Sequence, residues 1–169
     1  GRITVPPRIE NMLLGQLKRA IDRCYADPEH SGRLSNNHHL TTVACLLVLL
    51  ASVQGSSAGR DPRAQPHDPR FDTATRWLVR AAKEQFDRDG VHFEYSTGYH
   101  MCAAECLALA GLAFLEPPTA TGTSPIRTAQ DRWERLLSGF PDVAGSLAAA
   151  VRFADAVTRP DGSYPLVGD

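Results

Sequence analysis

Two segments of the chain have apolar side chains on nearly every helical face, and a soluble protein keeps such helices in its interior. The first covers residues 38–54 and contains the run VACLLVLLASV, and the second covers residues 98–115 and is rich in Ala, Leu and Cys. Segments 9–25 and 72–86 instead repeat apolar residues every three or four positions, which is typical of helices with one buried face. The sequence therefore predicts two buried helices that alternate with two amphipathic ones.

Two more helices are predicted after the second buried segment, at residues 126–137 and 143–157. We expect Asp72 and Asp142 to be the N-caps of the third and sixth helices, because a carboxylate accepts a hydrogen bond from the first free backbone N–H groups. The chain is thus expected to be one all-α domain over residues 1–169, built from antiparallel helical hairpins. The alternation of buried and amphipathic helices favours part of an (α/α) toroid over a four-helix bundle.

The composition is that of an ordinary soluble domain. Of the 169 residues, 43% are hydrophobic and 22% are charged, and the net charge of −1 gives no indication of a nucleic-acid partner. The longest apolar run is too short to span a bilayer, so no membrane insertion is expected. No signal peptide is visible, although the chain begins with Gly instead of Met.

The four cysteines are predicted to be buried free thiols, because each lies in an apolar helical pattern and no CxxC motif is present. They are Cys24, Cys45, Cys102 and Cys106.

Titratable side chains are concentrated at the start of the second buried helix. Residues 92–100 contain two histidines, two tyrosines and one carboxylate, in a short alternating run that leads into Tyr99 and His100. The first buried helix is preceded by a similar polar stretch, SNNHHL, at residues 35–40. We expect the two helix N-termini to face each other and to form one site.

Each of these residues has a functional and a structural interpretation. Asn37 and His38 at a helix N-terminus provide donors for an anion, or else are an N-cap and an exposed first-turn residue. Tyr99 has a hydroxyl that can act as general base and then general acid, or else is a buried hydrogen-bonded aromatic. A metal site built from histidines with Glu94 or Glu105 is not predicted, because no pair has HxxxH spacing. No cofactor is expected either.

Three motifs together resemble the heparinase II/III-like polysaccharide lyases. They are the Asn37-His38 pair, the stretch RWLVRAAKEQFDRDGVHFEYSTGYH (76–100) and the segment PDGSYPLVGD (160–169). The resemblance covers residues 9–169, and it implies a helical toroid that continues into a β-sandwich. It also implies that this chain holds only part of the toroid and stops before the sandwich. His39 departs from the apolar residue that is usual at its position.

The resemblance implies β-elimination on a uronic-acid polysaccharide of the glycosaminoglycan or alginate type. By position, Asn37 and His38 would neutralise the uronate carboxylate. Tyr99 would take the C5 proton, protonate the leaving glycosidic oxygen, or do both in turn. A set of surrounding residues would contact the substrate: Asn36, His39, Glu94, His100 and Arg76. The family also suggests a secreted or periplasmic protein. Alone, residues 1–169 are expected to bind acidic glycans weakly and to cleave them slowly or not at all, with the Val143, Leu147 and Val151 face left uncovered.

Two other function classes stay open. A non-catalytic module would use the same groove to hold an acidic glycan. A different (α/α)-toroid enzyme is suggested by a loose terpene-cyclase-like pattern at Trp77, Gln85, Gly90 and Phe93, but the Asp-rich motif of such enzymes is missing. Glycoside hydrolysis would need two facing carboxylates, and only Glu94 is well placed.

Overall fold

The structure is a computed structural model that describes residues 6–29, 36–55, 68–113, 134 and 136–168. Over these ranges it is all-α, as predicted. Its helices are α1 (Pro7–Ala26), α2 (Asn37–Gly55), α3 (Pro69–Gln85), α4 (Thr97–Ala113) and α6 (Pro141–Val157). The predicted helix 126–137 lies mostly outside the described residues, which include helical Glu134 and a short helical piece at 136–139.

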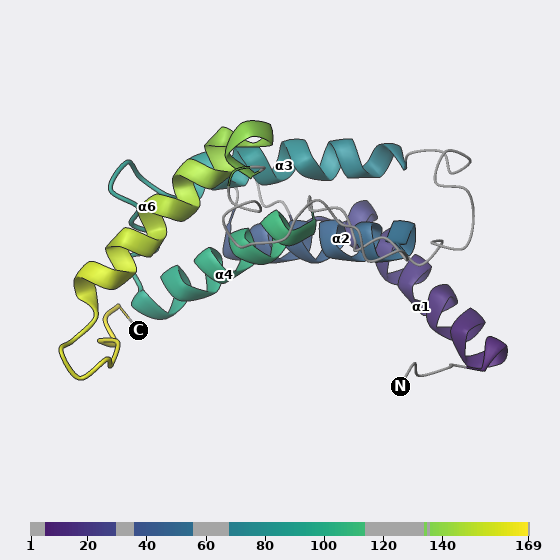
Figure 1. The fold of residues 1–169 in the computed structure, drawn as a ribbon, viewed down its shortest axis with the longest axis horizontal. Coiled ribbons are helices and arrows are strands. Elements are labelled where there is room, and N and C mark those ends of the chain that lie inside the picture. Colours follow the sequence, from purple (N-terminus) through teal and green to yellow (C-terminus); the bar gives the residue numbers. More distant parts are fainter. Residues whose placement is uncertain (1–5, 30–35, 56–67, 114–133, 135, 169) are drawn as a thin grey trace.

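Helix α2 is the centre of the arrangement. It packs against α1, α3 and α4, and α6 covers the other side of α3 and α4. In Figure 1, α2 and α4 run in one direction while α3 and α6 return in the other, as expected for helical hairpins. Helices α1 and α6 lie at the two ends of an open arch. The described helices show no closed ring, so the toroid stays a prediction.

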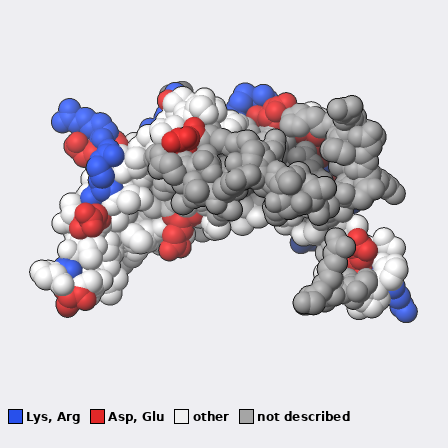
Figure 2. Space-filling model, in the orientation of Figure 1, with Lys and Arg blue, Asp and Glu red and all other residues white. Residues whose placement is uncertain are grey.

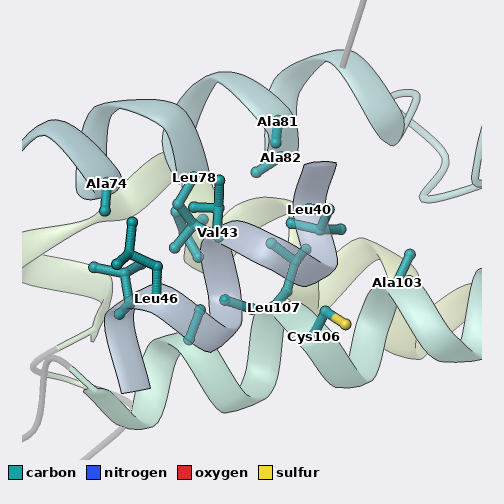
Figure 3. Close-up of a cluster of buried hydrophobic side chains, with 14 of the residues drawn as sticks. Leu40, Val43, Leu46, Ala74, Leu78, Ala81, Ala82, Ala103, Cys106 and Leu107 are labelled. Carbon is teal, nitrogen blue, oxygen red and sulfur yellow. The ribbon is translucent and has the colours of Figure 1, made fainter. Parts of the chain in front are cut away.

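The core is formed where α2 is enclosed by its neighbours (Figure 3). Leu40, Val43 and Leu46 of α2 are fully buried. The facing side of α3 is lined by alanines such as Ala74 and Ala81, whose small side chains let the two helices approach closely. The prediction that residues 38–54 form a buried central helix is confirmed.

The prediction of uniformly buried cysteines is wrong. Only Cys106 is buried, Cys24 is half-buried, and Cys45 and Cys102 are exposed. The reason is that α2 and α4 pack on each other but leave their outer side open among the described residues. Cys45 lies on this outer side of α2, one turn after the exposed Thr41, and Cys102 lies on the outer side of α4.

Helices α3 and α6 begin at prolines, which changes both predicted N-caps. Asp68, not Asp72, caps α3, and its carboxylate accepts a hydrogen bond from Arg70 N at 3.0 Å. Asp142 is in the first turn of α6, where it pairs with Lys83 Nζ of α3 at 2.9 Å. Proline is favoured at the first helical position because its missing N–H would be unpaired there, and it therefore fixes the helix start.

The expected uncovered face of α6 is also corrected. Val143 is fully buried, and Leu147 packs against the core. Only Val151 is exposed, because α6 lies across both α3 and α4.

The link between α3 and α4 is compact and keeps the predicted alternation. Phe86 and His92 form an isolated antiparallel bridge, and no strand is present in the parts of the chain that the structure describes. The polar side chains of His92 and Ser96 point inward and are buried, whereas Tyr95 is exposed. The sequence had left open which face of this stretch is buried, and the structure shows that it is the polar one.

Candidate functional site

The N-termini of α2 and α4 lie at the same end of the molecule and are connected by a direct contact. The Nδ2 atom of Asn37 at the start of α2 donates to Oε2 of Glu94, just before α4, at 3.4 Å. Farther along, Thr41 Oγ1 lies 3.5 Å from Cys106 Sγ, so the two parallel helices run side by side. The expectation that both polar stretches belong to one region of the structure is met for Asn37 and Glu94.

The position of Tyr99 follows from this helix pairing. Asn37 precedes Thr41 by four residues, and Tyr99 precedes Cys106 by seven. At a rise of about 1.5 Å per residue, Tyr99 lies about 4.5 Å farther than Asn37 along the common direction of α2 and α4, toward their N-terminal end. Tyr99 is 43% exposed, so the alternative of a buried aromatic is wrong. Within the described chain its hydroxyl makes no hydrogen bond, whereas its backbone N–H donates to Ser96 Oγ at 3.3 Å.

His38 is an exposed first-turn residue. Its Nδ1 lies 3.6 Å from Oε2 of Glu29, and the two side chains are 73% and 53% exposed. Its backbone N–H donates to Oδ1 of Asn37 at 2.8 Å. The imidazole is therefore open to a ligand from solvent, next to the Asn37 amide.

The backbone N–H groups of His38, His39 and Leu40 in the first turn of α2 are already paired, which changes the expected anion site. Asn36 caps the helix, because its Oδ1 accepts from the N–H of His39 at 2.7 Å and its carbonyl accepts from Leu40 N at 3.0 Å. An anion at this end would therefore meet the Asn37 amide and the His38 imidazole instead of bare N–H groups. Asn36 therefore has a structural role as the helix cap next to the site, and its contact with a substrate stays a prediction.

Two of the predicted substrate-binding histidines are buried, and that part of the prediction is wrong. His39 is 3% exposed and its Nδ1 lies 2.6 Å from the Pro28 carbonyl. His100 is 1% exposed and its Nε2 lies 3.0 Å from the Ala150 carbonyl of α6. Each lies one helical turn before buried core residues, and the period of the helix therefore turns it inward. Burial also lowers the pKa of His100, which keeps this imidazole neutral.

Arg76 lies elsewhere on the molecule. It is nine residues before the end of α3, which is about 13 Å along the helix axis from Gln85. It lines an open pocket of about 450 Å³ together with Val79, Lys83 and Phe140. The structure therefore does not bring Arg76 to the contact between Asn37 and Glu94.

Two residues next to the site were given no role in it by the sequence interpretation. Gln85 and His92 are both completely buried. Gln85 Nε2 donates to the Asn36 carbonyl at 2.5 Å, and Gln85 Oε1 lies 3.2 Å from His92 Nε2. A signal for Gln85 was present, because it follows Leu78 and Ala81 by seven and four residues and so lies on the apolar face of α3.

His92 is held in a dry environment. Phe86 packs edge-on against its ring, with centroids 5.5 Å apart, and against the ring of His100 at 5.8 Å. Burial, together with the nearby His100 imidazole, lowers the pKa of His92 from 6.5 to about 4. His92 is therefore neutral at physiological pH.

Charged side chains do not gather at one place on the face shown in Figure 2, where Lys and Arg alternate with Asp and Glu. Several are paired, as in Arg80 with Glu84 at 2.6 Å. Among the described residues, no three His, Cys, Asp or Glu side chains converge as a metal site. None of the described helices has the length and apolar character to cross a membrane.

Comparisons of the chain with models of protein families, with curated proteins and with solved structures found no match. The resemblance to the heparinase II/III-like lyases therefore stays a prediction.

Proposed function

We propose that this chain acts on uronic-acid polysaccharides by β-elimination, with Asn37, His38 and Tyr99 as the residues that contact the reacting sugar. The observation that carries the proposal is the hydrogen bond between Asn37 and Glu94, which joins the two polar N-termini at one end of the molecule. Tyr99 and His38 at that end are open to solvent, and Asn37 is half-buried.

The first requirement of the reaction is to neutralise the carboxylate next to C5, because its charge disfavours loss of the C5 proton. Asn37 has two amide N–H groups, and one of them is directed at Glu94. The other remains for a uronate oxygen, and the exposed His38 imidazole supplies a second donor. Both donors would strengthen as negative charge develops on the carboxylate in the enolate-like transition state.

The second requirement is proton transfer. The Tyr99 oxygen, as phenolate, would take the C5 proton. The released electron pair would form the C4–C5 double bond while the C4–O glycosidic bond breaks. The same hydroxyl would then return its proton to the leaving oxygen, so that proton and electrons balance. An exposed tyrosine at the same end of the molecule as Asn37 suits this role, whereas the buried His100 does not.

The test is to measure the ultraviolet absorbance of the unsaturated product when the chain is incubated with alginate, hyaluronan or heparan sulfate. We expect slow formation of the unsaturated product from at least one of these polymers. Tyr99→Phe should abolish it and leave binding of that polymer nearly unchanged, since only the hydroxyl is lost. Tyr95→Phe is the matched control, because Tyr95 is 75% exposed in the same stretch and has no proposed role.

Product formation at an unchanged rate in Tyr99→Phe would overturn the proposed base. Binding of a polyuronate without any product would identify a non-catalytic glycan-binding module instead of a lyase. If none of the three polymers binds or is cleaved, the assignment to uronic-acid polysaccharides is wrong.

A further inference from the structure

We infer that Gln85 and His92 are positioning residues, which fix the Asn37 amide and the Glu94 carboxylate through a closed ring of hydrogen bonds. The hydrogen-bond ring consists of four hydrogen bonds that link Asn36, Gln85, His92, Glu94 and Asn37 in turn, and the peptide bond between Asn36 and Asn37 closes it. The hydrogen bonds themselves are present in the structure, whereas their catalytic consequence rests on the proposed function.

The first step fixes the direction of the Gln85 amide. The atom that faces the Asn36 carbonyl lies 2.5 Å from it, and a backbone carbonyl only accepts hydrogen bonds. That atom must therefore be the NH2 group of Gln85. Its oxygen, Oε1, is consequently the atom that faces His92 at 3.2 Å.

The second step fixes the tautomer of His92. Because Gln85 Oε1 only accepts, Nε2 of His92 must carry the proton. The other ring nitrogen, Nδ1, faces the backbone N–H of Glu94 at 3.4 Å, so it must present a lone pair. Only the neutral imidazole with its proton on Nε2 satisfies both contacts. The lowered pKa of His92 agrees with this state.

The third step closes the ring at the proposed site. With its backbone N–H held by His92, Glu94 directs its carboxylate to Nδ2 of Asn37 at 3.4 Å. Asn37 Oδ1 is occupied at the same time by the N–H of His38 at 2.8 Å. The amide plane of Asn37 is thereby held at both ends, with one N–H left over for a ligand.

Gln85 and His92 act through other residues, because both are completely buried and so do not touch a polysaccharide. They connect three parts of the chain, since Asn36 precedes α2, Gln85 ends α3 and His92 lies before α4. Their role would be to keep donors near the productive geometry, where a displacement of about 1 Å lowers rates by about 100-fold.

The first experiment needs no activity. Imidazole ¹⁵N spectra of the chain should show His92 neutral and protonated on Nε2 at neutral pH. Gln85→Met should shift the His92 ring nitrogens and the side-chain amide signals of Asn37, while the His100 signals stay in place. Ser146→Ala is the matched control, because it removes a part-buried hydrogen bond from Ser146 Oγ to the Ala82 carbonyl outside the ring.

A charged His92, a proton on Nδ1, or Asn37 amide signals that do not respond to Gln85→Met would overturn the inference. If a variant fails to fold, the tautomer of His92 measured in the native chain decides the question by itself. These results are independent of whether any polysaccharide is cleaved.

The second experiment tests the catalytic consequence, with the polyuronate that the native chain turns over fastest. His92→Phe should lower kcat by about 10- to 100-fold with little change in KM, because the donors are misplaced and not removed. His92→Asn should restore part of this loss, since its Oδ1 takes the place of Nδ1 and accepts from Glu94 N. Ser146→Ala should keep the native kcat. Equal kcat values for His92→Phe and the native chain would contradict positioning, whereas absence of turnover in the native chain would contradict only the proposed function.

Discussion

At the scale of single residues, Gly90 is a position where the fold leaves no room for a side chain. Its φ of +85° lies in the region that favours glycine, and a Cβ there would lie 2.2 Å from the carbonyl carbon and oxygen of Ala149 on α6. The turn before the proposed site is therefore pressed directly against the α6 backbone. Glycine is required at this position for two reasons, namely the positive φ and the contact with the Ala149 backbone.

We expect Gly90→Ala to lower the free energy of unfolding by more than about 2 kcal/mol, from strained backbone and displaced α6. Gly145→Ala is the matched control, because Gly145 lies inside α6 with nothing within 4 Å of the added Cβ. It should raise stability by about 0.5–1 kcal/mol through helix propensity. Urea unfolding of both variants measures this contrast, and an equal effect of the two would refute the close approach of Gly90 to α6.

His92 makes stability depend on pH in a defined direction. Its pKa is about 4 in the folded chain and near 6.5 when exposed, so the unfolded chain binds a proton that the folded chain does not. The neutral ring therefore stabilises the fold fully above about pH 6.5, and this contribution is lost as the pH falls toward 4. Burial of His100 acts in the same direction.

The expected loss from His92 is up to roughly 3 kcal/mol between these pH values. Urea unfolding at several pH values should show a shallower pH dependence for His92→Phe than for the native chain. Replacement of the exposed His38 by Ala should leave the native dependence in place. A native slope retained in His92→Phe would show that another group causes the acid sensitivity.

At the scale of helices, α3 is tied to α1 through its own N-cap. Asp68 accepts from Arg70 N, and the Arg70 guanidinium contacts both Asp68 at 2.7 Å and Asp22 of α1 at 2.6 Å. The Asp68 side chain thus caps α3 and also orients Arg70, which joins α3 to α1.

We expect Asp68→Ala to destabilise the chain by about 1–2 kcal/mol, since it removes the cap and frees Arg70. Asp72→Ala, in the same first turn but without the capping bond, should cost less. Thermal unfolding followed by circular dichroism compares the two variants. A larger loss of thermal stability in Asp72→Ala than in Asp68→Ala would favour Asp72 as the N-cap, as the sequence predicted.

Periodicity in the sequence predicted which segments are helical and that residues 38–54 are buried, because the pattern of apolar side chains is itself the cause of burial. It did not predict the start of α3, where a proline at the first position outweighed a well-placed Asp72. It also did not predict that Gln85 and His92 pair with each other. That pairing depends on how the link after α3 folds back through the bridge between Phe86 and His92, which the spacing of residues within one helix does not contain.

The candidate site was predictable only in outline. The contact between Asn37 and Glu94 joins residues that are 57 positions apart. The residue types around Asn37 and Glu94 suggested a common site that also contained His39 and His100. The structure buries both histidines, so these two side chains lie outside the site. A histidine at a helix start is equally compatible with solvent and with the core, and only the packing of α2 and α4 decides between the two.

At the scale of the whole molecule, the first half of α1 projects beyond the helices that it packs on (Figure 1). Its apolar stripe continues outward from Ile21, which is 1% exposed, to Leu13 and Met12, which are 50% and 57% exposed. Ile9 extends the stripe by another turn and is 44% exposed. A contiguous apolar surface of this kind promotes association in water.

We therefore expect the chain to self-associate as its concentration rises, and the combined substitution of Met12→Lys and Leu13→Lys to reduce this association. Sedimentation velocity over a range of concentrations measures it. Lysine is a good helix former, so α1 should keep its helicity by circular dichroism. Val151→Lys is the matched control, because Val151 is 56% exposed on α6, away from α1. Association that Val151→Lys lowers as strongly as the α1 substitutions would place the contact at the α6 end of the arch instead, and a chain that stays monomeric throughout would show that the α1 stripe does not drive association.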